Sequence, residues 1–426
     1  MEKTVSIAYG ENSRLVRVPA ANLAWVVGPK EVPPVPDVAA AVHDAVRAPI
    51  GSPTLTELVA RYGTRTVVLV DDGTRSTPQR QILPALLDEL NAAGVPDGEI
   101  TAVIALGTHR EMNPAERLQR FGAEVIERIQ VLNLSTDPAD FVDAGITPSG
   151  VPIQVAKIYV ESDISIAVGN IIPHMYAGWG GGAKMVQPGV SSPLTTAKTH
   201  LLAGPRVYEL LGKADNPVRD EMETIARQTG LKFIVNVVLT PSLQVCAVVA
   251  GDLVKAHRAG VKIAEPIFTV EVDERPDIVI ASSYPADRDF WQGAKPLNNC
   301  GMLVKDGGTL ILAHPAPEGI AQDHPALLEL GLTDPEVVLR KVDAQQIEDG
   351  VAVACYLALC RTRQRAHIMM VSDGIAADEG ARIGFECLPD LDTAIERALA
   401  RHGKDARIGI VTHGGDIVGR IRGQQS

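Results

Sequence analysis

Short apolar runs rich in β-branched residues alternate with segments of helical spacing along the first half of the chain. Three of these runs are each followed by a polar loop: TRTVVLV (64–70), EITAVIAL (99–106) and SDISIAVGN (162–170). Apolar runs of this length are typical of parallel strands buried on both faces. Between the second and third runs, Asn113 is the expected N-cap of a helix over 114–121. The alternation predicts βαβ units, and so an α/β fold with a mainly parallel sheet flanked by helices.

The pattern changes in the middle of the chain and then restarts. Segment 232–252 contains two apolar runs around Thr240-Pro241-Ser242, which predicts a hairpin. The charged, proline-containing segment 272–277 is the expected domain boundary. Beyond it lie three more apolar runs: IVIASSY (278–284), GGTLILAHP (307–315) and AHIMMVSDG (366–374). The last run, 406–415, is compatible with closing either sheet.

The length of 426 residues is greater than that of an ordinary single domain. We therefore expect two domains with mainly parallel sheets flanked by helices. Residues 1–272 form the first and carry most of the chemistry, and residues 273–426 form the second and close a cleft, unless the last strand returns to the first domain. Ligands usually bind between such halves, so the active site is expected in the interdomain cleft.

Charge and cysteine content exclude several classes of protein. The formal net charge is -12 and lysines and arginines do not cluster, which argues against nucleic acid and anionic membranes as partners. The N-terminus lacks the apolar region of a signal peptide, and no apolar run reaches the ~18 residues of a membrane span, so a cytoplasmic protein is expected. The five cysteines include no CxxC motif, which indicates reduced thiols rather than a disulfide framework or a zinc site.

Ligands of parallel sheets bind beyond the carboxyl ends of the strands, so the functional residues are expected in the loops after the apolar runs. The first loop contains Asp72, Thr74 and Arg75. Its backbone N–H groups and hydroxyls suit a phosphate or a carboxylate, and Arg75 can clasp a carboxylate with its guanidinium fork. An ordinary capped turn with a surface ion pair explains them equally well. In the second loop, His109 follows Gly107-Thr108 and is placed for proton transfer, although a loop histidine is often only structural.

The third loop, 169–189, is the most informative segment. It contains His174 and then the run Gly178-Trp179-Gly180-Gly181-Gly182-Ala183-Lys184. Glycines let the backbone approach a ligand closely, and a lysine in such a pocket is a plausible covalent attachment point. The spacing is neither that of a P-loop nor GxGxxG. The alternative is a flexible surface loop with a solvated lysine.

Three further residues complete the candidate site. His200 is expected on a helix after the capping segment SSPLTT (191–196), where a neutral imidazole can bind a metal such as nickel. With no HExxH motif and no His/Cys cluster, most ligands of any metal must come from something other than side chains. Gln292 and Lys295 are three residues apart, so they share one helix face and can hold a carboxylate together, unless that face is simply solvated.

Together these motifs resemble the nickel-dependent lactate racemase family. The likeness rests on five motifs in order: Asp72-Gly73-Thr74-Arg75, Gly107-Thr108-His109-Arg110, Pro173-His174 with Gly181-Gly182-Ala183-Lys184, His200, and Gln292 with Lys295. Each motif alone is weak, but five in this order and spacing are specific. The resemblance covers most of the chain and implies a 2-hydroxy acid racemase or epimerase, that is, an isomerase.

The resemblance also implies a cofactor and a role for each residue. Lys184 is expected to carry a nickel-pincer nucleotide, the pyridinium-3-thioamide-5-thiocarboxylic acid mononucleotide, made by separate cofactor-synthesis enzymes. His200 is the expected protein ligand of nickel, and His109 and His174 are the expected acid/base pair. The remaining roles follow in the same way: cofactor binding by Asp72, Thr74, Gly181 and Gly182, and substrate binding by Arg75, Gln292 and Lys295.

One departure from the family pattern bears on the substrate. The family often has a serine and an arginine inside the glycine-rich loop, whereas this chain has Gly180 and Ala183. Smaller side chains there predict a substrate larger or more polar than lactate, unless position 183 faces away from the pocket and the change is neutral. Two alternatives remain at this point: a nicotinamide dehydrogenase, which should show GxGxxG after a strand, and a non-catalytic binding protein on the same fold.

Overall fold

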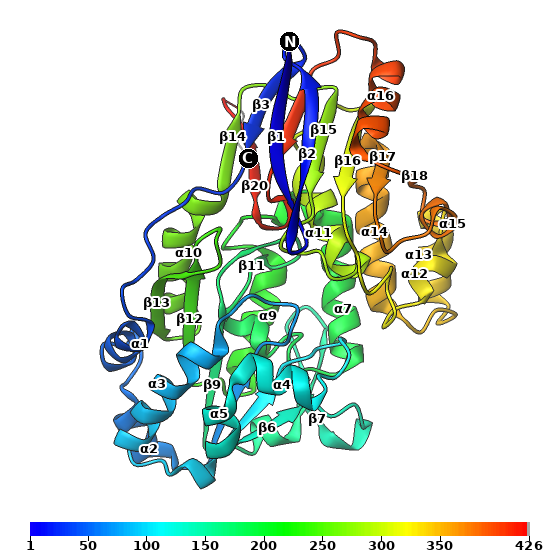
Figure 1. Cartoon of the computed structure of the whole chain (residues 1–426). Helices are drawn as coiled ribbons and strands as arrows, with labels where there is room; N and C mark the ends of the chain where they lie inside the picture. Colours follow the sequence, from blue (N-terminus) through cyan, green and yellow to red (C-terminus); the bar gives the residue numbers. More distant parts are fainter. Residues whose placement is uncertain (424–426) are drawn as a thin grey trace.

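The computed structural model describes residues 1–423 and contains two six-stranded sheets, each in its own lobe (Figure 1). The strands of the first sheet are, in spatial order, β13 (Val245–Gly251), β12 (Phe233–Leu239), β9 (Ile164–Asn170), β4 (Thr66–Val70), β5 (Ile100–Ile104) and β6 (Gln130–Asn133). All neighbours are parallel except β12 and β13. The predicted parallel sheet and the predicted hairpin over 232–252 are both confirmed.

The second sheet is parallel throughout. Its strands are, in order, β18 (Glu386–Leu388), β17 (Ala366–Val371), β16 (Gly308–Ala313), β15 (Ile278–Ser282), β19 (Ile408–Val411) and β3 (Leu23–Val27). The last predicted run, 406–415, therefore supplies a strand of the second sheet. Four two-stranded sheets complete the strands: β1 (Glu2–Tyr9) with β2 (Asn12–Pro19), β7 (Phe141–Ile146) with β8 (Pro152–Ala156), β10 (Pro173–His174) with β11 (Gly178–Trp179), and β14 (Thr269–Val272) with β20 (Val418–Ile421).

Helices flank both sheets, as the sequence predicted. Those of the first lobe are α1 (Val38–Arg47), α2 (Leu55–Tyr62), α3 (Gln79–Ala92), α4 (Pro114–Phe121), α5 (Ala123–Arg128), α6 (Lys157–Val160), α7 (Pro193–Ala203), α8 (Val207–Leu210), α9 (Pro217–Gln228) and α10 (Lys255–Phe268). Those of the second lobe are α11 (Phe290–Gly301), α12 (Ala326–Leu330), α13 (Pro335–Asp343), α14 (Gly350–Arg365), α15 (Ala377–Arg382) and α16 (Leu391–His402). Helices α7 and α14 pack against each other across the lobes.

The N-terminal segment does not join the lobe to which the sequence assigned it. Residues 1–272 were predicted to form the first domain, but β3 pairs with β19 of the second sheet. The hairpin of β1 and β2 covers the same sheet, where Ile7 and Val16 share a core with Ile280 (Figure 1). The reason is that an apolar run of five residues needs only a free parallel edge, and β19 provides one. We therefore call residues 28–268 the first lobe, and residues 1–27 and 269–423 the second; the domain boundary near 272 stays an interpretation.

The central strands of the first sheet position the chemistry. Every residue of β4 and β9 is buried, so the residues that can meet a ligand lie in the loops beyond the strand ends. Because β4, β5 and β9 run parallel, the loops that follow them meet at one edge of the sheet. Helix α4 begins as predicted, with Asn113 and Glu116 forming a capping box. This helix holds the second loop against the first.

Two expectations about the whole chain can be compared with the structure. Within residues 1–423, no helix combines the length and apolar character needed to cross a membrane. All five cysteines are free thiols: Cys300, Cys355 and Cys360 are buried, and Cys246 and Cys387 are partly exposed.

Candidate active site

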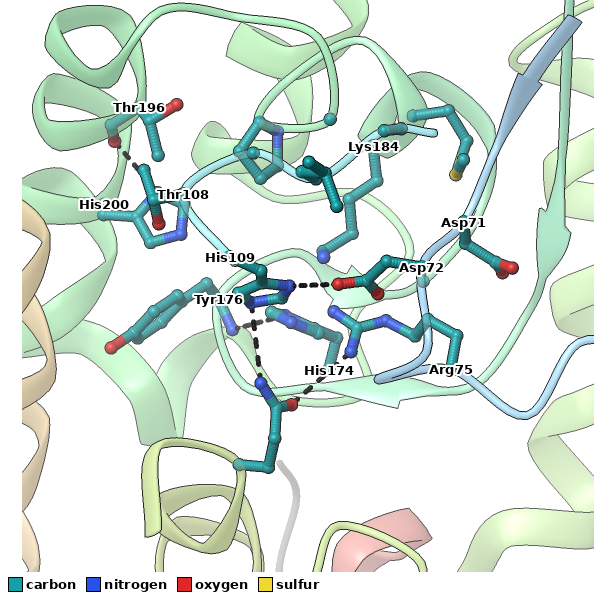
Figure 2. A pocket seen from close by; sticks show the side chains of 18 of the residues that line it. Asp71, Asp72, Arg75, Thr108, His109, His174, Tyr176, Lys184, Thr196 and His200 are labelled. Carbon is teal, nitrogen blue, oxygen red and sulfur yellow. Dashed lines mark hydrogen bonds and ion pairs between the residues drawn. The ribbon is translucent and has the colours of Figure 1, made fainter. Parts of the chain in front are cut away.

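One cavity lies between the lobes, where the loops after β4, β5 and β9 face α11 and α14 (Figure 2). Nine of the eleven residues proposed from sequence line it: Asp72, Arg75, His109, His174, Gly181, Lys184, His200, Gln292 and Lys295. The other two stand just behind the lining. Thr74 donates its hydroxyl proton to Asp72 at 2.6 Å, and the backbone N–H of Gly182 donates to Asn236 at 2.8 Å.

His109 and Asp72 form a pair that joins two of the loops. Nδ1 of His109 lies 2.7 Å from Oδ2 of the buried Asp72 (Figure 2). Burial raises the pKa of Asp72, but His109, Arg75 and the Thr74 hydroxyl lower it by more, so it lies well below its usual range. An ionised carboxylate accepts only, so Nδ1 of His109 carries a proton and donates it. A neutral His109 then presents a lone pair at Nε2.

Gln292 connects this pair to the cationic groups of the cavity. Its Nε2 lies 3.5 Å from Nε2 of His109, and its Oε1 lies 3.5 Å from Nη1 of Arg75. The Lys295 ammonium also donates to Oε1. Because the amide oxygen faces two cations, the amide N–H faces the His109 lone pair. The predicted helix face shared by Gln292 and Lys295 is present on α11.

His174 has the opposite hydrogen-bonding state. Its Nδ1 accepts from the backbone N–H groups of Tyr176, at 3.2 Å, and Ala177, at 3.3 Å. A neutral imidazole that accepts at Nδ1 carries its proton at Nε2. Burial, followed by the charges of Lys184 and Lys295, holds the pKa of His174 well below its usual value, so the ring is neutral. His174 therefore offers an N–H group where His109 offers a lone pair.

The glycine-rich loop is folded tightly rather than flexible. Gly181 and Gly182 have φ values of 72° and 58°, the left-handed region that favours glycine. A Cβ on Gly181 would lie 2.7 Å from Oδ1 of Asn236, too close for a side chain. The buried Arg219 of α9 donates to the carbonyls of Ala177, at 3.3 Å, and Gly181, at 3.1 Å. The alternative of a mobile surface loop is therefore wrong.

Lys184 follows these glycines and extends into the cavity (Figure 2). Within residues 1–423 its ammonium makes no hydrogen bond and no ion pair. Burial, and then the charges of Arg75, Lys295 and Arg219, hold its pKa well below the usual value. A lysine amine with a lowered pKa is more often unprotonated, and the unprotonated amine is the nucleophile. The position suits covalent attachment of a carboxyl or thiocarboxyl group.

His200 lies on a helix, α7, as the sequence predicted, and this helix begins inside the SSPLTT segment, after the N-cap Ser192. Its Nδ1 lies 2.9 Å from the carbonyl of Thr196, so Nδ1–H donates and Nε2 is left free. Burial, followed by the charge of Lys184, lowers the pKa of His200 to about 3. A neutral ring tied at one nitrogen to a backbone carbonyl is the usual state of a metal-binding histidine. In the described part of the chain, no three His, Cys, Asp or Glu side chains gather into a metal site.

Arg75 and Lys295 bring positive charge to the cavity from opposite lobes. Neither forms an ion pair with a carboxylate among the described residues. Burial, and then the charge of Arg75, lowers the pKa of Lys295 to about 7. Arg75 and Lys295 are half-buried, and two neighbouring cations without an ion-pair partner are stabilised when an anion joins them. The cavity is therefore built to receive a carboxylate or a similar anion.

Several lining or supporting residues were not found from sequence. Trp291, Val351 and Cys355 line the cavity from the second lobe, and Thr108 lines it beside His109. Val351 and Cys355 lie in a segment whose sequence predicts only a helix, whereas Thr108 and Trp291 adjoin His109 and Gln292 and could have been found from that adjacency. Arg219 did leave a signal, because it is a charged residue on the buried face of α9, next to Val218 and Met222.

Comparison with known families gives two matches along the chain. Residues 9–207 match the lactate racemase N-terminal domain, and residues 272–418 match the lactate racemase C-terminal domain. The chain is 29% identical over 386 residues to the lactate racemase of Lactiplantibacillus plantarum, covering 88% of this chain and 90% of that protein. It is also 29% identical over 387 residues to the lactate racemase of Thermoanaerobacterium thermosaccharolyticum, covering 89% and 90%.

Solved structures show the same architecture. The lactate racemase apoprotein from Thermoanaerobacterium thermosaccharolyticum superposes with a TM-score of 0.87 at 26% identity, covering 98% of this chain and 100% of that one. A protein from Thermotoga maritima gives a TM-score of 0.72 at 18% identity, covering 92% and 100%, and shows likeness of fold alone.

Proposed function

The chain belongs to the lactate racemase family, and on that premise we propose that it inverts C2 of a 2-hydroxy acid with a nickel-pincer nucleotide held on Lys184. It is an isomerase of that family, so neither the dehydrogenase nor the non-catalytic binding protein considered from sequence applies. The proposal is carried by one observation. A single cavity holds an accepting His109, a donating His174, an unpaired Lys184 and two unpaired cations.

The residues present fit this cofactor. Lys184 has a free amine of lowered pKa for a thioamide link, and His200 has a free Nε2 for nickel. Gly181 lines the same cavity as Lys184, and because it has no side chain the backbone can approach whatever the lysine carries. When bound, the nucleotide supplies an electron-poor centre that takes a hydrogen with its electron pair and gives it back.

The cationic groups hold the substrate by its carboxylate. Arg75 from the first lobe and Lys295 from the second would each form a charge-assisted hydrogen bond, and Gln292 keeps both side chains in place. A carboxylate held at this point turns the C2 hydroxyl of one enantiomer toward one side of the cavity and that of the other enantiomer toward the opposite side. Each side therefore needs its own proton-transfer group.

His109 and His174 would be those two groups. The lone pair of His109 Nε2 can take the hydroxyl proton while the C2 hydrogen leaves with its electron pair, which produces a planar 2-keto acid. Once that acid has turned its other face, the hydrogen returns and the oxygen takes the Nε2 proton of His174 from the opposite side. His174 regains a proton from solvent and His109 releases its extra proton to solvent, so both imidazoles are neutral again after each turnover. Each positioned acid or base contributes a factor of about 10²–10⁴ in rate.

The substrate is proposed to be larger or more polar than lactate. Gly180 lines the cavity where the family often has a bulkier residue, and the hydroxyl-bearing Thr108 and Thr196 line it as well. Ala183 gives no support, because it is fully buried in the core of the first lobe. Chiral assays of lactate, malate, phenyllactate, 2-hydroxyglutarate and aldonic acids with loaded enzyme would rank the substrates. Lactate with the highest kcat/KM contradicts this part of the proposal and leaves the racemase assignment in place.

The whole proposal is tested by intact-protein mass spectrometry and a racemisation assay. The chain is produced with and without the cofactor-synthesis enzymes. We expect a mass increase and activity only in their presence, and neither in Lys184→Ala. An adduct of the same mass in Lys184→Ala would refute attachment at this lysine, and an active protein without any adduct would refute the cofactor.

A further inference from the structure

The loop that carries His109 is held on both sides by the second lobe. On one side, Oγ1 of Thr108 lies 3.0 Å from Nε2 of His324. On the other, the backbone N–H of Arg110 donates to Asp323 at 3.0 Å, and the Arg110 guanidinium lies 3.3 Å from Glu318. These contacts come from one stretch of the second lobe, the 318–324 segment. His109 therefore sits between two residues whose positions depend on how the lobes are placed.

His324 itself is buried and fully engaged. Its Nδ1 lies 2.8 Å from Oδ2 of Asp349, and its ring stacks on Trp291 with centroids 4.1 Å apart and an interplanar angle of 23°. Burial raises the pKa of Asp349, but the hydrogen bond from His324 and further contacts lower it by more, so the pKa lies below its usual range. The carboxylate accepts from Nδ1–H, which leaves Nε2 of a neutral His324 as an acceptor.

The direction of these bonds determines what Thr108 offers to the cavity. With Nε2 of His324 as acceptor, the single hydroxyl proton of Thr108 is donated to His324. The lone pairs of Thr108 are what remains for the cavity that it lines. Asp349 also caps α14, accepting from the backbone N–H groups of Val351 and Ala352. One carboxylate therefore fixes both the His324 ring and the start of a cavity-lining helix.

These cross-lobe contacts belong to the closed arrangement. The cavity measures about 90 Å³, whereas ligand pockets usually measure about 300–1,000 Å³. A nucleotide and a hydroxy acid cannot be admitted unless the lobes separate. Separation breaks the bond between Thr108 and His324, and closure restores it.

We propose that His324, oriented by Asp349, is a positioning residue that sets the Thr108–His109 loop whenever the lobes close. The inference rests on the proposed function of His109 as a proton-transfer group. Asp72, from the same lobe as His109, fixes the tautomer of the imidazole. His324, from the other lobe, places the backbone from which the imidazole extends. Alignment of the base is thereby tied to closure over the substrate.

The test uses enzyme loaded with cofactor and a hydroxy acid that it racemises. His324→Phe keeps a flat ring against Trp291 but has no nitrogen, and Thr108→Val removes the hydroxyl at almost constant shape. Each is expected to lower kcat about tenfold, the value of one hydrogen bond, with KM and adduct mass unchanged. The double variant should be no more than about twofold slower than the slower single variant, and the matched control Thr108→Ser should stay within about twofold of wild type.

Two outcomes overturn the inference. One is a lower melting temperature in both single variants with wild-type kcat at a temperature well below it, because a merely structural contact behaves in that way. The other is a double variant whose loss is the product of the single losses. A wild type with neither adduct nor racemisation overturns the proposed function and this inference together, whereas an active wild type with unaffected variants overturns this inference alone.

Asp349→Asn keeps the inference testable where His324→Phe does not fold. An asparagine Oδ1 can still cap α14, while its amide N–H groups replace the acceptor that faces His324. His324 must then accept at Nδ1 and donate from Nε2, so the bond to Thr108 reverses. Because the reversed bond still holds the loop in place, we expect kcat within about twofold of wild type and a nearly unchanged melting temperature. A kcat lower by about tenfold in this folded variant would assign the effect to the direction of the hydroxyl rather than to the placement of the loop, and would overturn the inference.

Discussion

Replacing Asp72 by asparagine should disable His109 without removing it. Oδ1 of Asp72 accepts from the backbone N–H of Thr74 at 3.1 Å and from its hydroxyl at 2.6 Å. These donors would hold the asparagine oxygen in the same place, so its amide N–H would point to Nδ1 of His109. The imidazole would then have to accept at Nδ1 and carry its proton at Nε2. The lone pair that the substrate hydroxyl needs would be gone.

The size of the effect follows from what a positioned base contributes. Loss of a general base lowers kcat by about 10²–10⁴-fold, which corresponds to about 3–5 kcal/mol of transition-state stabilisation. Cofactor loading is measured in parallel, because the family resemblance also implies cofactor binding by Asp72 and only a loss of kcat at full loading reports on His109. The folded-state pKa of Asp72 lies below its unfolded value, so its contribution to stability is complete above about pH 4 and lost only in stronger acid. Neutral pH is therefore the right condition for comparison.

The neighbouring Asp71 provides a matched control. It is 5% exposed against 4% for Asp72, but it bonds to Thr77, Gln79 and Arg120 and to no histidine. Asp71→Asn should lower the melting temperature, and it should lower kcat far less than Asp72→Asn does. Racemisation is followed by chiral chromatography from each pure enantiomer, with adduct mass checked in parallel. The reasoning fails if Asp72→Asn retains kcat within about tenfold of wild type, or if its loss multiplies with that of His109→Ala.

Four further expectations concern the same cavity. Lys295→Gln or Arg75→Gln should raise KM by a factor that corresponds to about 1.5–3 kcal/mol of binding free energy, the value of one charge-assisted hydrogen bond. An unchanged KM would contradict the proposal that both side chains bind the substrate carboxylate. Burial, and then the charge of Arg75, lowers the pKa of Lys295 to about 7. The ammonium is lost as pH rises through that value, so kcat/KM should fall above it. Lys295→Arg should remove this fall, and a fall that persists in the variant would belong to another group. His174→Ala should slow interconversion in both directions by the same factor, because the equilibrium constant between enantiomers is unchanged; a wild-type rate rules out the two-sided mechanism. Gly181→Ala places a Cβ 2.7 Å from Asn236 at a φ of 72°, so the melting temperature and the adduct yield should both drop, and no change in either would contradict the tight loop.

The sequence alone was enough to locate most of the chemistry. His109, His174, Lys184 and Arg75 all follow apolar runs that had to be buried parallel strands, and such strands present their carboxyl ends at one edge. That rule brings residues a hundred positions apart into one cavity without any knowledge of side-chain contacts. The helix face of Gln292 and Lys295 and the helix of His200 follow from local spacing and capping in the same way.

Tertiary structure decided what depends on contacts between distant segments. The five residues of β3 do not reveal that they pair with β19, because both sheets are mainly parallel and either could accept a short apolar strand. The bond between Thr108 and His324 joins loops 216 residues apart, and local pattern carries no information about such a pair. The sequence is compatible with Ala183 facing either the cavity or away from it, and the loop turns it into the core. The direction in which a loop residue points is set by the packing around it, and hydrogen bonds across the lobes form only once both lobes are in place.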